Sequence, residues 1–566
     1  MIFIGLLTII VFKTFTYKLG YIKNNPNSYY IRISSIILLY AGVLSLNTFY
    51  IQAIGSGIGI YSGLFHVTQI SQMIEVLIYI TGLFILSAWP IIQNNLIKNN
   101  SYPTNYSILV LFSTLGSVLL LSTSDLISMY LSIELQSFSL YILSTLYRDS
   151  ESSTSAGLKY FLLGGLSSCI ILLGSGIIYA YTGITNFESL YSLISITNYN
   201  YIIQGLSLGL ILIFVGLLFK ISSSPFHQWA PDVYDDTPTI VTIWLTIIPK
   251  ISILILLLEL YTQIGIIGDP SSLLINTNGY VEYLYSDNTN IISESINKLI
   301  GYTTMNVTNK LLLISSILSL IIGTVVGLAQ TKIKRLLAYS TISHIGFILL
   351  SLAINSVQSI DSLLFYLIQY TLTNLNIFLI IIAISYCFSI KTNINNDNTH
   401  KDIKYISEFK GLFFFNPLLS LSLAICLFSM AGIPPLIGFF SKQFVLYSAV
   451  QEGYNFISIV AILASVVSAS YYLKIIKVLY TSQENEDTIS LAMAEEKNSI
   501  SQELENQNKV SSVCFTSEGL ENQTIKLTNL HSYLISLLTL SILFFILKPN
   551  LILNSTQLLS LSIFNF

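Results

Sequence analysis

Charged side chains are scarce in this chain. Of its 566 residues only 9% are Asp, Glu, Lys or Arg, whereas 53% are hydrophobic. A soluble domain carries roughly 25% charged residues, so the composition excludes an ordinary soluble domain and predicts a polytopic membrane protein. Basic residues are not in excess either, because 25 Lys and Arg stand against 28 Asp and Glu, for a net charge of −3. That balance argues against a nucleic-acid partner.

Cysteine is also rare, and the phosphate-binding glycine motifs are missing. The chain has four cysteines, with no CxxC pair and no Cys/His cluster. This excludes a disulfide framework and argues against iron–sulfur, haem or zinc ligation. Neither GxxxxGK[ST] nor GxGxxG occurs. We therefore expect no cofactor-binding and no metal-ligating residues, and any electrons involved must be carried by other chains.

Long apolar runs dominate what is present. Because a membrane span needs about 20 mostly apolar residues, the runs predict about 14 transmembrane helices and an all-α fold. Runs of this length exclude a membrane β-barrel. The seventh and twelfth runs are long and interrupted. The predicted helices cover residues 1–17, 31–51, 70–92, 105–122, 124–147, 157–182, 205–235, 238–262, 310–330, 333–356, 361–390, 414–452, 455–480 and 530–548.

Basic residues fix the predicted orientation. They gather in the odd-numbered loops, for example at Lys23, Lys98 and Arg335, and are almost absent from the even-numbered loops. By the positive-inside rule the odd loops face the matrix or cytoplasm and both termini face the opposite side. Two polar inserts, residues 263–309 and 481–529, interrupt this pattern. We interpret the acidic second insert as a solvated segment, with a contact to another subunit as the alternative.

The helices also predict an internal duplication. Predicted helices 4–8 and 9–13 resemble two copies of one five-helix unit, and the fourth helix of each copy holds a proline-bearing break, at Pro225 and at Pro434–Pro435. Because five is odd, the two copies would cross the membrane in opposite directions, as inverted repeats do. The predicted divisions are residues 1–98 (helices 1–3), 105–262 (first repeat), 263–309, 310–480 (second repeat), 481–529 and 530–566 (helix 14 and tail).

Four charged residues lie inside apolar stretches: Glu134, Lys220, Lys250 and Lys442. A charge near the bilayer centre costs at least about 3 kcal/mol and usually marks an ion or proton path. The alternatives are structural. Lys220 could neutralise carbonyls freed by the proline break, and Glu134 could form a buried ion pair that only fixes two helices together.

Histidines and the remaining charges are more ambiguous. His344, in TISHIGF, is either a satisfied core residue or a proton relay between Lys250 and Lys442, since the ordinary pKa of histidine is about 6.5. His227 is expected to cap or pack. Lys474 is expected to anchor one membrane face, with a role in proton entry as the alternative. Glu75 and Glu259 lie near helix ends, where their carboxylates are expected to reach the interface.

One stretch carries a family resemblance. LFKISSSPFHQWAPDVYDDTPTIVT, at 218–242, closely resembles the signature of the antiporter-like subunits of respiratory complex I. Its PDVYDDTPTIVT variant looks like the subunit 2 group, the N-type subunit of bacteria. The resemblance covers roughly residues 100–480. The supporting matches are KRLLAYSTISHIGF (334–347), SMAGIPPLIGFFSKQFVL (429–446) and SASYYLKIIKVLY (468–480).

The resemblance implies a subunit of NADH:ubiquinone oxidoreductase that translocates protons without a redox centre of its own. NADH, FMN, iron–sulfur clusters and ubiquinone would be bound by other subunits. The implied partners are the neighbouring antiporter-like subunit 4, the small subunit 4L, accessory subunits and phospholipids. The family's central hydrophilic axis would correspond here to Glu134, Lys220, Lys250, His344 and Lys442.

The composition suggests a location, and two rival functions stay open. Abundant Ile, Asn, Tyr and Phe suit an AT-rich genome, which with the resemblance predicts a multi-pass protein of the mitochondrial inner membrane. Both termini would then face the intermembrane space. The first rival is a subunit of a multisubunit cation/proton antiporter or membrane-bound hydrogenase. The second is a scaffold that has lost transport, although a pure scaffold should prefer apolar packing where these charges lie.

Overall fold

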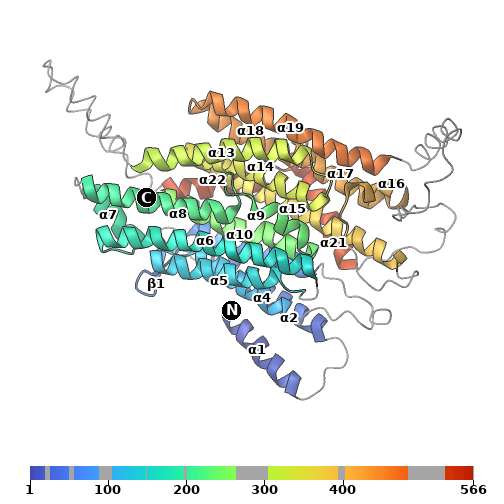
Figure 1. The fold of residues 1–566 in the computed structure, drawn as a ribbon, viewed down its shortest axis with the longest axis horizontal. Coiled ribbons are helices and arrows are strands. Elements are labelled where there is room, and N and C mark those ends of the chain that lie inside the picture. The colour runs from blue at the N-terminus through green and yellow to red at the C-terminus, as the bar shows by residue number, and fades with distance from the viewer. Residues whose placement is uncertain are drawn as a thin grey trace, which may run out of the picture.

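The computed structural model describes residues 1–18, 26–49, 57–87, 105–147, 150–196, 200–262, 304–392, 402–481 and 529–564. Nearly all of these residues are helical (Figure 1). The helices are α1 (Ile2–Lys18), α2 (Pro26–Thr48), α3 (Gln69–Ser87), α4 (Tyr106–Leu121), α5 (Leu126–Ser144), α6 (Glu151–Thr182), α7 (Phe187–Ile196), α8 (Asn200–Ile221), α9 (Trp229–Asp236), α10 (Thr239–Leu260), α13 (Thr304–Leu328), α14 (Ile333–Ile354), α15 (Val357–Thr392), α16 (Leu412–Phe415), α17 (Pro417–Ala431), α18 (Ile437–Gln451), α19 (Asn455–Tyr480), α21 (Asn529–Leu543) and α22 (Asn550–Phe564).

Each predicted run contains at least one of these helices. Eleven are long and apolar enough to cross a membrane, and three shorter apolar helices lie at α1, α4 and α17. The all-helical, polytopic prediction is therefore confirmed in its main part. The predicted inserts lie mostly outside the described residues, because the structure describes neither 263–303 nor 482–528.

Three elements differ from the prediction. Residues expected to be loop form a small antiparallel hairpin, with β1 (Ile58–Ile60) paired to β2 (Phe65–Val67), so the fold is not purely α. The amphipathic helix α7 lies between α6 and α8, and the predicted C-terminal tail contains α22. All three are too short to give the 20-residue apolar signal on which the prediction relied.

Both predicted breaks are present and have the same backbone geometry. The first runs between α8 and α9, and the second between α17 and α18. Each preceding helix ends on a left-handed residue, Ser222 with φ 65° and Gly432 with φ 87°. The next amide then reaches back to the carbonyl five residues earlier, Ser223 to Leu218 at 3.1 Å and Ile433 to Phe428 at 3.2 Å. These bonds form a Schellman-type end that satisfies carbonyls left free by the helix.

The two breaks differ in the residue that takes the left-handed position, and this predicts a difference in stability. A non-glycine residue in that region is strained by roughly 1 kcal/mol, which glycine avoids. We therefore expect Ser222→Gly to stabilise the protein by less than about 1 kcal/mol, because the entropy cost of glycine offsets part of the relieved strain. The change should appear as a small rise in the temperature at which the assembled protein is half inactivated.

The reciprocal change is the matched control. Gly432→Ser should lower the midpoint, because a side chain there is both left-handed and crowded by the Lys442 side chain at 3.1 Å. The opposite order of the two variants would contradict this account of the breaks.

Helices α10, α14 and α15 form the centre of the bundle, and the other helices pack around them (Figure 1). In the most apolar 18-residue stretch of each helix, all residues of α10 are buried, together with 94% of those of α14 and 89% of those of α15. By contrast, only 33% of the residues in the corresponding stretch of α6 are buried and 39% of those in α19, and both helices expose leucine and isoleucine side chains. A bundle with an apolar outer surface is what a lipid environment stabilises, because lipid does not drive apolar side chains inward.

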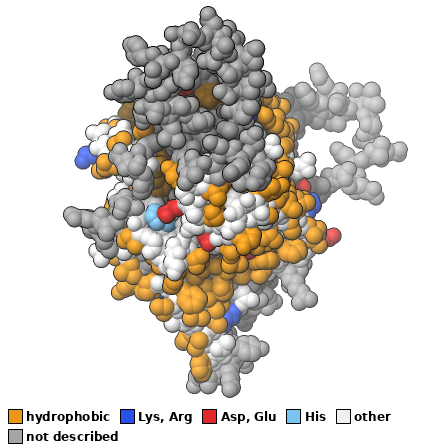
Figure 2. All heavy atoms as spheres, turned by 90° about the vertical axis from the view of Figure 1, so that its left-hand side faces the viewer, with side chains coloured by type: hydrophobic (Ala, Val, Ile, Leu, Met, Phe, Trp, Pro, Cys, Tyr) orange, Lys and Arg blue, Asp and Glu red, His pale blue; other side chains and the backbone are white. Residues whose placement is uncertain are grey.

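The hairpin joins three connections at one end of the bundle, which we call the hairpin end (residues 58–67, 122–128 and 183–187). The amide of His66 donates to Ser122 O at 2.6 Å, Ser124 N to Leu64 O at 3.2 Å, and Leu126 N to Thr185 O at 3.0 Å. Figure 2 faces this end and shows a largely hydrophobic surface with isolated charged side chains. These three segments are the second, fourth and sixth connections of the predicted topology. They are expected at the same end, because a chain that crosses the membrane repeatedly returns to the same face after every second span.

The opposite end is held by charge. We call it the ion-pair end, and it joins α6, α9, the start of α14 and the segment after α15. Asp232 pairs with Lys159 at 3.2 Å and with Arg335, while Lys332 pairs with Asp235 at 2.6 Å. Lys334 pairs with Asp402 at 2.7 Å. These contacts bring together parts of the chain that adjoin four odd-numbered connections of the predicted topology.

Candidate functional site

Lys220 lies in the last turn of α8, just before the first break. Its ammonium group is buried and has no hydrogen-bond partner among the described residues, and the same holds for Oε1 of Glu134 on α5. The two groups are close enough for the charge of Glu134 to act on Lys220, but they form no direct ion pair. The predicted contact is therefore an electrostatic one across a gap.

A cavity lies beside Lys220, between α5, α6, α8 and α10. Lys220 and the polar side chains of Gln136 and Ser137 line it, together with Trp229 and Pro249. A cavity with several polar groups is able to hold water, whereas an apolar one of similar size stays dry. The cavity reaches from Lys220 to the helix that carries Lys250, since Pro249 is the residue before it.

A residue that we did not predict binds one carbonyl at the first break. Trp229, in the first turn of α9, donates its indole N–H to the carbonyl of Phe219 at 3.0 Å and stacks on Tyr160 with ring centroids 4.8 Å apart. Lys220 itself makes no hydrogen bond to a carbonyl of this break in the part of the chain that the structure describes. Trp229 was visible in the motif HQWAP, but its direction depends on the turn that follows Pro225.

Lys250 lies in the middle of α10 and is 1% exposed. Its ammonium group donates to the hydroxyl of Thr341 on α14 at 3.1 Å and lies 5.3 Å from the ring centroid of Tyr234. No carboxylate among the described residues pairs with it. A lysine held by one hydroxyl and one aromatic face keeps little compensation for its charge, so its protonation is sensitive to nearby charges.

His344 lies three residues after Thr341 on α14 and is 3% exposed. Its Nδ1 is 2.7 Å from the hydroxyl of Tyr366 on α15, and its Nε2 is 3.3 Å from the hydroxyl of Tyr472 on α19. It touches neither Lys250 nor Lys442 by a hydrogen bond. The histidine is therefore a satisfied core residue in its contacts, and both of its partners are tyrosine hydroxyls, which can donate and accept.

Lys442 is on α18, beyond the second break, and is 7% exposed. Its ammonium group turns back and donates to the carbonyls of Met430 at 2.8 Å and Ala431 at 3.0 Å, at the end of α17. It also lies 5.8 Å from the ring centroid of Phe347 on α14. A cation at a helix C-terminus is favoured by the helix dipole. At the second break, Lys442 thus plays the capping role that we considered for Lys220 at the first break.

The candidate residues lie in the interior of one bundle. The cavity connects Lys220 to α10, Thr341 connects Lys250 to α14, and His344 follows one turn later. The charge of Lys442 is close enough to act on His344. Tyr370 adds a further link, since its hydroxyl donates to the carbonyl of Thr246 at 3.0 Å and its ring lies 6.2 Å from that of His344.

The other charged and histidine candidates lie off this line. His227 contacts the hydroxyl of Ser224 at 3.3 Å and approaches the ring of Tyr339, as a packing residue does. Lys474 is exposed on α19, which fits an anchor. Glu75 and Glu259 are half-buried. Among the described residues no group of three or more His, Cys, Asp or Glu could hold a metal ion.

Apolar helices, two helix breaks and buried lysines beside those breaks define a class, the helical membrane transport subunits. The comparisons with known proteins narrow it. The family model described as NADH:quinone oxidoreductase/Mrp antiporter matches residues 123–308 and 303–468. NADH-ubiquinone oxidoreductase chain 2 of Rhizopus oryzae is 47% identical over 95% of this chain and 96% of its own length. NADH-quinone oxidoreductase subunit N of Pelagibacter ubique is 33% identical over 83% and 88%.

Solved structures show the same fold at low identity. A chain of respiratory complex I from Thermus thermophilus has a TM-score of 0.65 at 24% identity, covering 97% of this chain and 98% of its own. A chain of the Mrp complex from Dietzia has a TM-score of 0.72 at 16% identity, covering 100% and 96%. The chain belongs to the NADH:quinone oxidoreductase/Mrp antiporter family, and within it to the group of NADH-ubiquinone oxidoreductase chain 2 subunits.

Proposed function

We propose that this subunit translocates protons in the membrane arm of complex I, along the line Glu134, Lys220, Lys250, His344 and Lys442. The observation that carries the proposal is Lys250. It is 1% exposed at the centre of the most buried helix, held by a hydroxyl at 3.1 Å and by no carboxylate of the described residues. A structural lysine in such a place would be expected to have an anionic partner, because an uncompensated buried charge destabilises the fold.

The mechanism follows from charges acting on neighbouring groups. Quinone reduction in other subunits would change the charge near Glu134, and Lys220 would move toward or away from it. The altered charge of Lys220 changes how strongly Lys250 holds its proton, because like charges in a low-dielectric interior disfavour each other. The proton then passes by Thr341 and the tyrosine-bound His344 to Lys442, or leaves toward the hairpin end.

The inverted duplication is part of this proposal. Its support is the matched pair of Schellman ends at Ser222 and Gly432 and a matched pair of close helix crossings. A side chain on Gly116 would meet the backbone of Gln136, and one on Gly323 would meet the backbone of Ser343. The first crossing joins α4 to α5 and the second joins α13 to α14. We propose five-helix repeats over helices α4–α10 and α13–α19, within a total of about 14 spans.

The same proposal covers location and partners. The subunit would lie in the mitochondrial inner membrane with both termini facing the intermembrane space. Antiporter-like subunit 4, the small subunit 4L, accessory subunits and phospholipids would surround it, and NADH, FMN, iron–sulfur clusters and ubiquinone would be held by other subunits. The similarity to the Rhizopus protein supports this location, while the likeness to the Mrp complex keeps the cation/proton antiporter as the rival function.

The test is the proton-to-electron ratio of assembled enzyme carrying Lys250→Ala. We expect a lower ratio than in the wild type, because the central proton carrier is lost. Lys477→Ala is the matched control, since Lys477 is an exposed lysine in the last turn of α19, outside the proposed proton path, and its loss should leave the ratio unchanged. A wild-type ratio in Lys250→Ala would refute the role of Lys250 and favour the scaffold.

A further inference from the structure

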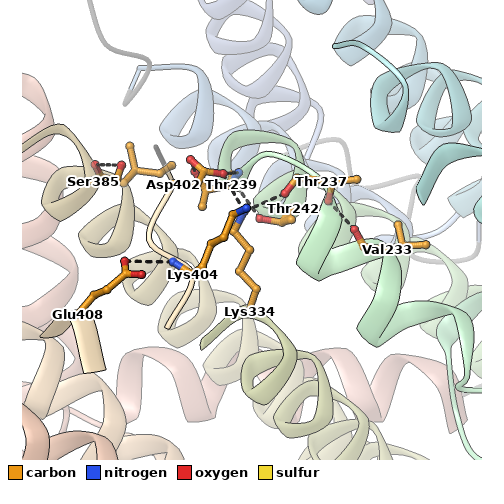
Figure 3. Close-up of polar contacts among 10 residues, drawn as sticks. Val233, Thr237, Thr239, Thr242, Lys334, Ser385, Asp402, Lys404 and Glu408 are labelled. Carbon is orange, nitrogen blue, oxygen red and sulfur yellow. Dashed lines mark hydrogen bonds and ion pairs between the residues drawn. The ribbon is translucent and has the colours of Figure 1, made fainter. Parts of the chain in front are cut away.

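At the ion-pair end, a charged contact links α10 and α14, the two helices that are also joined by the hydrogen bond between Lys250 and Thr341. Lys334, in the first turn of α14, is 4% exposed and donates to Asp402 Oδ2 at 2.7 Å and to the carbonyl of Thr237 at 2.8 Å. Figure 3 shows Lys334 between Asp402 and the Thr237–Thr239 turn. A cation in the first turn of a helix is opposed by the helix dipole, so these two acceptors are what stabilise it there.

Asp402 also caps the helix that carries Lys250. The N-cap position of α10 is Pro238, which has no capping side chain. Asp402 supplies the cap from 163 positions away, because its carboxylate accepts from Thr239 N at 3.0 Å and from Thr239 Oγ1 at 3.3 Å. Burial raises the pKa of Asp402, but the Lys334 charge and the bonds from Lys334 and Thr239 outweigh it, and the pKa is lowered. The carboxylate is thus charged, as a cap and ion-pair partner requires.

The segment that carries Asp402 is itself held firmly. Ile333 N donates to Lys404 O at 3.0 Å and Ile406 N to Thr331 O at 3.1 Å, so the segment pairs with the start of α14. Glu408 closes the loop by accepting from the amides of Lys404 and Tyr405, both at 3.3 Å. In the part of the chain that the structure describes, Glu408 makes no hydrogen bond or ion pair with α10, so within this segment the link to α10 depends on Asp402.

The helical repeat places this contact in line with the buried lysine. Thr341 follows Lys334 by seven residues, which is two turns and about 10 Å along the same face of α14. On α10, Thr239 and Thr246 are also seven residues apart, and Lys250 follows Thr246 by four, so all three share one face. The same faces of α10 and α14 are therefore linked twice, by Asp402 and Lys334 near the surface and by Lys250 and Thr341 inside the bundle.

We propose that Asp402 and Lys334 are positioning residues, which lock the axial register of α10 against α14 and so hold Lys250 at hydrogen-bonding distance from Thr341. This inference rests on the proposed function of Lys250. A shift of one residue along a helix is about 1.5 Å, enough to break a 3.1 Å hydrogen bond. Removal of the lock would impair proton transfer through Lys250 without touching any residue on the proton path.

The test compares Asp402→Ala with Glu408→Ala in assembled complex. We expect Asp402→Ala to lower the proton-to-electron ratio and to speed amide hydrogen exchange in the first turns of α10, and Glu408→Ala to change neither. Asp402→Glu, which keeps the charge, should restore part of the ratio. Because Asp402 acts through Lys250 and Thr341, adding Asp402→Ala to Thr341→Val should lower the ratio no further than Thr341→Val alone.

The outcomes separate this inference from the proposed function. If Lys250→Ala lowers the ratio but Asp402→Ala does not, the positioning role is wrong and the role of Lys250 stands. If Lys250→Ala leaves the ratio unchanged, the proposed function itself fails. If Asp402→Ala and Asp402→Glu both abolish assembly while Glu408→Ala assembles, or if the losses from Asp402→Ala and Thr341→Val simply add, Asp402 serves the fold in general and the positioning role is refuted.

Discussion

Gly438→Ala is expected to abolish assembly of the protein. Gly438 is the second residue of α18, just after the second break, where the half-helices α17 and α18 approach each other closely. A Cβ atom at this position would overlap the carbonyl oxygen of Ser429 and meet its carbonyl carbon at 2.7 Å. Because the obstacle is backbone, no side-chain rotation can relieve it. We expect a cost of about 3 kcal/mol or more, the upper range for overpacking, measured as loss of assembled complex on native gels.

Gly176→Ala is the control for this prediction. Gly176 is also in a helix, α6, but a Cβ there meets nothing within 4 Å. Alanine favours the helix over glycine by roughly 1 kcal/mol, so this variant should assemble at least as well as the wild type. Normal assembly of Gly438→Ala would mean that α17 and α18 are farther apart than the structure places them.

Two substitutions of Lys442 are expected to separate its structural role from its role in proton transfer. Lys442→Met removes the donor from the carbonyls of Met430 and Ala431. Leaving a buried polar group unsatisfied costs about 1–3 kcal/mol, and two are affected. We therefore expect a large fall in assembled complex. Lys442→Arg keeps a cationic donor that cannot lose its proton in a protein. It should assemble better than Lys442→Met, yet give a lower proton-to-electron ratio than the wild type.

Lys477→Met is the matched control for Lys442→Met, because Lys477 is exposed in the last turn of α19. It should leave both the amount of complex and the ratio unchanged. If Lys442→Arg pumped with the wild-type ratio, Lys442 would be a helix cap alone, and the proton path would end before α18.

The sequence predicted the features that depend on long segments. Runs near 20 apolar residues have few alternatives in lipid, which is why each predicted run contains a helix. The breaks could also be predicted, since Pro225 and the Pro434–Pro435 pair cannot continue a helix. The hairpin at 58–67 could not, because strands of three residues are too short to carry a periodic signal. Helix α22 was missed because its 15 residues are shorter than a full span.

For the candidate site, residue types were easier to predict than contacts. Charge in an apolar run identified Glu134, Lys220, Lys250 and Lys442, because desolvation makes such residues rare. Their partners depend on how separate helices pack. Nothing near Lys250 in sequence pointed to Thr341, and nothing near Asp402 pointed to Thr239. The direction of Lys442, back toward its own break, also required the three-dimensional path of the turn at 432–436.

The two ends of the bundle should respond differently to ionic strength. Four charged side chains at the ion-pair end are partly exposed, those of Lys159, Asp232, Lys332 and Arg335. A 1 M salt solution shortens the screening length to about 3 Å. The hairpin end depends mainly on backbone hydrogen bonds, which salt screens far less. Concentrated salt should therefore weaken the contacts between helices at the ion-pair end only. At the other end, the small hairpin at residues 58–67 should keep the helices together.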